Sequence, residues 1–352
     1  MFESLGLENW TPLGASLVAG AIIGLLFGVL AQRSRFCLRR GLVGDQSERS
    51  SALGLWLTAL LVAIAGTQVL VATELADFST HRFLSSNIAV PAIILGGLLF
   101  GAGMVLARGC ASRLTVLTGT GNLRALVAII TFSIVAHATL KGILAPARVW
   151  LSSFTFDLGN TAGLTDLPGS PFIWIAITVA VLIVAITRLG VGGKDLAYGA
   201  AIGALVPLGW FVTGTFLFDE FDPIVFESLA FTSASSEALF WTVAGTAIAP
   251  GFGVGFFGGV LSGSALAALT TREFEWSGFN QDVPTQRYLI GGSLMGVGGV
   301  LAGGCTVGAG LSGVSTLSFS AILALSAIIA GALTTKALMS NTTANAQAIP
   351  AE

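Results

Sequence analysis

Residues 96–110 read GGLLFGAGMVLARGC, and residues 291–305 read GGSLMGVGGVLAGGC. Ten of the fifteen aligned positions are identical, and both copies end on a cysteine at the same distance from the opening Gly-Gly pair. The whole chain contains only three cysteines. Two of them at matched ends of one repeat therefore indicate a duplicated unit, and the rest of the chain is interpreted around it.

The composition is that of an integral membrane protein. The chain has 352 residues, of which 54% are hydrophobic and 10% are charged, whereas soluble domains carry about 25% charged residues. Its 46 glycines are too many for loops alone and favour closely packed membrane helices. A net charge of −2 without a basic run argues against nucleic-acid binding. Three distant cysteines form neither a disulfide framework nor a zinc motif.

Nine apolar segments are long enough to cross a bilayer, which takes about 20 residues. We therefore predict an all-α, multi-pass protein with a single membrane domain over residues 1–352. Pro250-Gly251 separates the seventh crossing from a short non-crossing piece before it. The predicted crossings are 13–31, 52–73, 88–107, 123–145, 171–189, 195–217, 250–271, 287–303 and 318–338.

The repeat divides these crossings into two halves. Four helices within 13–145 precede a spacer helix at 171–189, and four more lie within 195–338 before a polar tail at 340–352. Corresponding helices are five crossings apart, an odd number, so the second half is expected to be inverted relative to the first. Inverted repeats are common in transporters and place the substrate site at their interface.

Loop charge predicts the orientation. The connections 32–50, 108–124 and 188–194 are rich in arginine and lysine, whereas 218–227 holds four acidic residues and no basic one. Because basic loops mark the cytoplasmic side, we expect the N-terminus outside and the C-terminus in the cytoplasm.

Each repeat copy is followed by a segment too short to cross. These segments read CASRLTVLTGTGN at 110–122 and CTVGAGLSGVSTLS at 305–318, a composition typical of re-entrant half-helices. The N-terminus of such a half-helix attracts anions through unpaired N–H groups and the helix dipole. Cys110 and Cys305 are expected at these N-termini, and Cys37 follows the first crossing in a similar place.

Three thiols at such positions are the candidate site. They could bind a soft metal, carry out redox exchange, or contact a sulfur-bearing substrate through weak S–H donation; anion-receptive helix ends favour the third. Arg39 and Arg40 are interpreted first as topology determinants. The predicted pathway residues are Cys37, Cys110 and Cys305, with Gly109, Gly304, Thr306 and Arg113 in supporting positions.

Four motifs resemble the YeeE/YedE family of membrane proteins. They are RFC at 35–37, GAGMVLARGC at 101–110, GWFVTG at 209–214 and GGVLAGGCTVG at 298–308, and the resemblance extends over about 13–338. It implies nine crossing helices with re-entrant helices in an hourglass, and uptake of thiosulfate through the prokaryotic inner membrane. It also implies that Cys37, Cys110 and Cys305 pass the ion along, and that a cytoplasmic TusA-like sulfur carrier is a partner.

We therefore predict a transporter of a small sulfur-containing anion, with thiosulfate as the first choice. The chain is not expected to be an enzyme or to hold a cofactor or metal, and its other neighbours are membrane lipids. The alternatives are an intramembrane sulfurtransferase, a transporter of another sulfur or selenium species and, third, a soft-metal channel.

Overall fold

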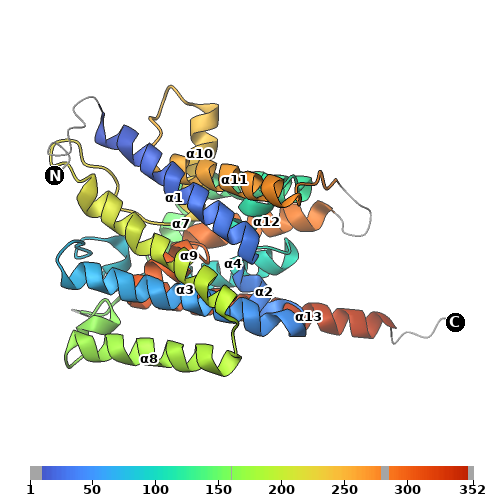
Figure 1. Cartoon of the computed structure of the whole chain (residues 1–352), viewed down its shortest axis with the longest axis horizontal. Helices are drawn as coiled ribbons and strands as arrows, with labels where there is room; N and C mark the ends of the chain where they lie inside the picture. The colour runs from blue at the N-terminus through green and yellow to red at the C-terminus, as the bar shows by residue number, and fades with distance from the viewer. Residues whose placement is uncertain (1–9, 160, 279–284, 348–352) are drawn as a thin grey trace.

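The computed structural model describes residues 10–159, 161–278 and 285–347. The α-helices are α1 (Pro12–Ser34), α2 (Leu38–Val43), α3 (Gln46–Ala72), α4 (Val90–Leu106), α5 (Ala111–Gly119), α6 (Leu123–Lys141), α7 (Ala145–Ser152), α8 (Pro171–Leu189), α9 (Gly193–Phe211), α10 (Phe231–Val243), α11 (Phe252–Thr271), α12 (Thr285–Leu301) and α13 (Phe319–Gln347). The long helices form one bundle, and the short α10 stands across their direction (Figure 1).

Shorter elements connect these helices. The described residues form three 3-10 turns, η2 (Arg82–Leu84), η3 (Leu164–Asp166) and η6 (Val314–Thr316), and two π-helical segments, η4 (Val212–Phe216) and η5 (Gly308–Gly313). The described residues also form two short antiparallel strands, β1 (Asn87–Ile88) and β2 (Phe156–Asp157). The prediction of an all-α membrane protein is confirmed.

Eight helices in the described part of the chain are long and apolar enough to cross a membrane. The remaining predicted crossing, 287–303, corresponds to α12, of which 17 residues are described. The helix α13 continues to Gln347, beyond the predicted end of the last crossing at 338. The predicted polar tail at 340–352 therefore begins as helix, and its residues 348–352 lie outside the described part.

Glycines allow α1 and α11 to touch along their lengths. A Cβ atom on any of these glycines would overlap a backbone carbonyl oxygen of the facing helix. Successive glycines along α1 meet successive residues along α11 in the same order, so the two helices run parallel. The glycines are Gly20, Gly24 and Gly28 of α1, and Gly255, Gly259 and Gly263 of α11.

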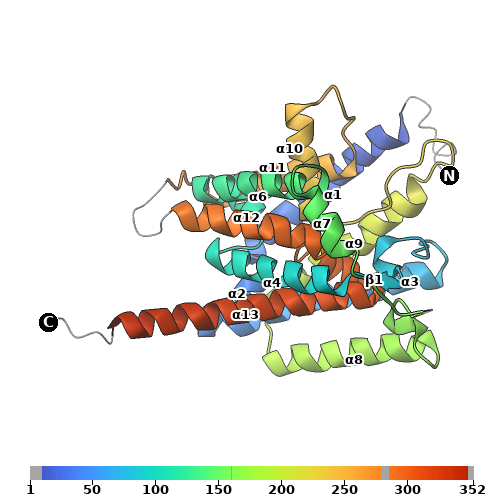
Figure 2. The same cartoon turned by 180° about the vertical axis from the view of Figure 1, so that it is seen from behind.

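The two copies of the repeat, α4 and α12, also meet through glycine, but they run antiparallel. Gly96 lies against Gly298, and Gly103 lies against Gly291. These are the first and eighth positions of each copy, so each contact pairs the first position of one with the eighth of the other. Figure 2 shows α4 between α12 and α13, and both helices pack on it. Inverted copies of one unit would be oriented in this way.

In other pairs too, a helix from one predicted half packs on a helix from the other half, and the counterparts of the two, with the halves exchanged, pack in the same way. The helix α1 packs on α11, and α9, in the corresponding place of the second segment, packs on α3. Likewise α4 packs on α13, and α12 packs on α6. The spacer α8 lies along one edge of the bundle beside α3 (Figure 1), and Ile186 is its one buried residue.

The α1–α11 contact can be tested with neighbouring glycines. Gly259→Leu should lower the thermal unfolding midpoint in detergent, because overpacking a close contact costs about 1–3 kcal/mol or more. Gly258, one residue earlier, is exposed and has open space around it, so Gly258→Leu should leave the midpoint almost unchanged. Equal midpoints for the two variants would contradict the glycine contact.

Candidate functional site

All three cysteines follow the same backbone turn. In each case the residue two places earlier adopts a left-handed conformation, which reverses the chain direction after a long helix. A short helical element then starts at or just after the cysteine, and Cys37 and Cys110 are the N-cap residues of α2 and α5. The left-handed residues are Arg35 (φ 52°), Arg108 (φ 55°) and Gly303 (φ 75°).

The turn brings two of the cysteines together. The Sγ atoms of Cys37 and Cys110 are 3.9 Å apart, and Cys110 Sγ is also 3.2 Å from the Oγ atom of Ser112. Both thiols are free and buried. The two residues are far apart in sequence, so this thiol pair is a product of the packing of α1 against the α4–α5 segment.

Cys305 lies at the other end of the α4–α12 pair, because the two helices are antiparallel. It is fully buried, and its Sγ accepts a hydrogen bond from the backbone N–H of Gly308 at 3.3 Å. Its carbonyl oxygen accepts from Ala309 N–H at 2.9 Å. Within the described chain Cys305 has no contact with the other two thiols, so the structure joins two of the three predicted pathway residues directly.

The remaining predicted residues surround these thiols. A Cβ on Gly304 would come within 2.6 Å of the Ala309 nitrogen, and one on Gly109 would touch the Leu114 side chain. Thr306 is buried next to Cys305. Arg113, in the first turn of α5, donates through Nη1 to Gln32 Oε1 at 3.4 Å.

Cys37, one member of the thiol pair, lines a basic cavity of about 390 Å³, which we call the arginine cavity. Arg39 and Arg40, interpreted from the sequence as topology determinants, line it. Arg40 pairs with Glu48 at 2.8 Å, while the buried Nε of Arg39 has no partner. Five guanidinium groups against two carboxylates would concentrate anions here. The charged lining residues are Arg35, Arg39, Arg40, Arg108, Arg113, Asp45 and Glu48, and Cys37 forms part of the wall.

A second cavity, of about 400 Å³, lies at the opposite end of the bundle, and we call it the carboxylate cavity. Gly308, the donor to Cys305, is in its wall. Sequence reasoning missed this cavity, although Glu237 is the one acidic residue in the apolar, hydroxyl-rich α10. Its titratable and aromatic lining residues include His81, Arg82, Trp210, Phe226, Glu227 and Glu237.

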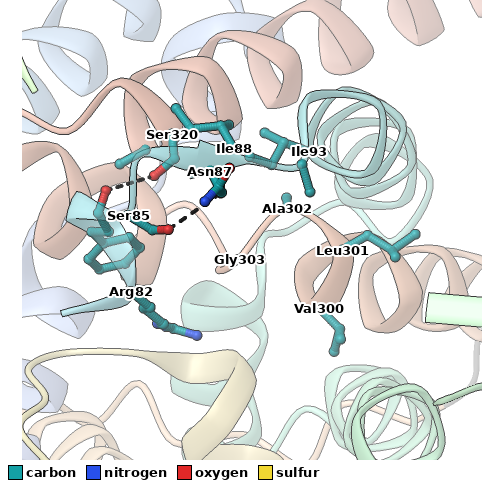
Figure 3. A pocket seen from close by; sticks show the side chains of 13 residues that line it. Arg82, Ser85, Asn87, Ile88, Ile93, Val300, Leu301, Ala302, Gly303 and Ser320 are labelled. Atoms are coloured by element: carbon teal, nitrogen blue, oxygen red, sulfur yellow. Dashed lines mark hydrogen bonds between the residues drawn. The ribbon is translucent and has the colours of Figure 1, made fainter. Parts of the chain in front are cut away.

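Arg82 also borders a smaller cavity of about 210 Å³ beside it. Figure 3 shows the guanidinium of Arg82 extending away from Ser85 and Asn87. Ser85 donates to the carbonyl of Asn87, and Ser320 donates to that of Phe83. These hydrogen bonds in the small cavity do not involve the guanidinium of Arg82.

Burial changes the acid–base behaviour of the carboxylate cavity. It raises the pKa of Glu227 to about 8, a shift that the nearby Glu237 carboxyl adds to and the Arg82 charge opposes. Burial also raises the pKa of Glu237, against the charge of Lys141. For His81, burial and then the neighbouring Arg82 lower the pKa to about 4, so its imidazole is neutral near pH 7.

The sequence matches known proteins along most of its length. Residues 33–334 match the family described as sulphur transport. The chain is 25% identical over 343 residues to the thiosulfate transporter TsuA of Escherichia coli, which covers 90% of this chain and 93% of the relative. It is 26% identical over 323 residues to the TsuA of Spirochaeta thermophila, which covers 87% and 93% respectively.

The thiol pair predicts selective cross-linking. Mild oxidation should join Cys37 to Cys110, because only a small shift separates a 3.9 Å contact from the ~2.05 Å of a disulfide. Thiol titration after denaturation should then find one free thiol in the oxidised wild type and none in Cys305→Ala. Cys37→Ala should keep both of its thiols, and their loss would show that Cys110 and Cys305 approach each other instead.

Proposed function

The chain belongs to the sulphur transport family, and from that premise we propose that it imports a small sulfur-containing anion, with thiosulfate as the first choice. The two relatives described above are named thiosulfate transporters. The import would take place across a prokaryotic inner membrane. The arginine cavity would face the cytoplasm, which places the N-terminus outside and the C-terminus inside.

The observation that carries the proposal is the contact between Cys37 and Cys110 at the base of the arginine cavity. Neither thiol is in a disulfide, so each can donate a weak S–H hydrogen bond to a sulfur atom. A sulfur-bearing anion bound beside this thiol pair would meet two soft groups and, beyond them, five arginines. This combination suits an ion with a sulfur end and an oxyanion end.

We propose that the anion moves from Cys305 to Cys110 and then to Cys37. Cys110 is the N-cap of the nine-residue α5, so the first N–H groups and the dipole of this helix can hold the anionic oxygens while the thiol holds the sulfur. Each contact is weak, and a permeation site must release what it binds. The arginine cavity then collects the ion at the exit.

We also propose that 13–145 and 195–338 are inverted halves of an hourglass, with 171–189 as a spacer. The antiparallel α4–α12 contact and the exchanged helix pairs support this division. The carboxylate cavity would be the outer opening and the arginine cavity the inner one. A TusA-like sulfur carrier docking at the arginine end would receive the imported ion.

Replacing single thiols tests the route. Cys37→Ala, Cys110→Ala and Cys305→Ala should each reduce uptake of labelled thiosulfate about tenfold or more, since a hydrogen bond to a charged group contributes about 1.5–3 kcal/mol. The measurement is initial uptake by cells that have no other thiosulfate transporter.

Ser326→Ala, on an exposed face of α13, is the control and should retain wild-type uptake. Normal uptake by all three cysteine variants would disprove the relay. A persistent persulfide on a cysteine after exposure to thiosulfate, detected by mass spectrometry, would instead show covalent sulfur transfer.

A further inference from the structure

We propose that the carboxylate cavity takes up a proton together with the anion: Glu227 and Glu237 share this proton, which removes one negative charge beside Arg82 so that a dianion can bind there. The inference rests on the proposed function and adds the coupling ion to it. It assigns a role to three charged residues that the cysteine route leaves unused.

The three groups face one space without neutralising each other directly. Within the described residues, neither carboxylate makes a hydrogen bond or an ion pair, and the guanidinium of Arg82 makes none either. Arg82 rests over the ring of Phe83 at 5.0 Å. A cation left open to a cavity in this way is available to a ligand.

The main chain around Glu227 is fixed, so its carboxyl has a defined place. Thr213 Oγ1 donates to the Glu227 carbonyl at 2.6 Å and accepts from its N–H at 3.2 Å. Trp210 lines the same cavity, is buried, and its Nε1 has no partner. The cavity thus offers two donors without partners, Arg82 and Trp210, beside the two carboxyls.

The charges around the pair come from several elements. His81, next to η2, accepts a hydrogen bond from Phe83 N–H through Nδ1, which fits its neutral state. Lys141, at the end of α6, acts on Glu237. His137, also on α6, is hydrogen-bonded to Ser236 at 2.9 Å and points to that serine.

Charge balance shows why a proton is needed. With both carboxyls ionised, Glu227, Glu237 and Arg82 sum to −1, and a dianion would enter against repulsion. One proton on the pair brings the sum to zero, and the oxyanion can then bind the guanidinium without net repulsion from the cavity. Like charges in one buried site disfavour double ionisation, and the raised pKa of Glu227, about 8, makes that proton available near neutral pH.

The direction of the pH dependence follows. Below about pH 7 the pair already holds its proton, so the KM for uptake should be constant. As the external pH rises through the pKa of Glu227, about 8, the proton must be supplied on binding. The KM should then increase about tenfold per pH unit, as linkage to one proton requires.

Calorimetry tests the proton directly. Sodium thiosulfate is titrated into the purified protein at pH 8.5 in two buffers with different heats of ionisation. The wild type should take up about three quarters of a proton per bound anion, because about that fraction of the pair is unprotonated at this pH. Glu227→Gln and Glu237→Gln should bind with little proton uptake, and their KM for uptake should stay low at pH 9. A misfolded variant could not show tight binding at high pH.

Glu220→Gln is the matched control. It removes an acidic charge from the same loop, but Glu220 is exposed and outside the cavity, so proton uptake should remain. Binding by the wild type without proton uptake, and with a constant KM between pH 6 and 9, would overturn the inference. Absence of any thiosulfate binding or uptake by the wild type would overturn the proposed function instead.

Discussion

The backbone contact between α4 and α12 is the constraint on which the rest of the structure depends. Gly96 and Gly103 of one copy meet Gly298 and Gly291 of the other, and any side chain at these positions would separate the helices. In a membrane such close approach replaces the hydrophobic effect as the source of helix association. Because the copies are antiparallel, the same sequence element places one cysteine at each end of the bundle. Two cavities at opposite ends of the bundle, each beside a cysteine of the repeat or its neighbour, follow from one repeated segment.

The arginine cavity and the carboxylate cavity are chemically different although they lie beside similar sequence elements. At one end, Cys37 joins Cys110 beneath five arginines. At the other end, Cys305 accepts a hydrogen bond from Gly308 and contacts no second thiol among the described residues. The carboxylate cavity, which Gly308 lines, holds two carboxyls and one arginine without an ion pair. After α9, where the first half has Cys37, the chain instead forms the π-helical segment η4. The departure from symmetry therefore gives the two ends of the bundle different chemistry toward an anion.

Much of the architecture is predictable because apolar length and glycine spacing are local properties. The predicted helix at 171–189 coincides with α8, and short helical elements follow Cys110 and Cys305, where half-helices were predicted. The thiol pair and the carboxylate cavity depend on contacts between distant segments, which no local pattern reports. Glu227 illustrates this limit: in the sequence it was one of four acids used to orient a loop, whereas in the structure it faces Arg82 and Glu237 across a cavity.

The turn that precedes each cysteine has a consequence for the residues that occupy it. A left-handed conformation is natural for Gly303 but costs a residue with a side chain about 1–2 kcal/mol. Arg35 and Arg108 accept this strain at the two turns that border the arginine cavity. Glycine would fit the backbone better there and would remove a positive charge from the cavity wall. The wall of the arginine cavity is therefore a place where local stability is exchanged for electrostatic potential.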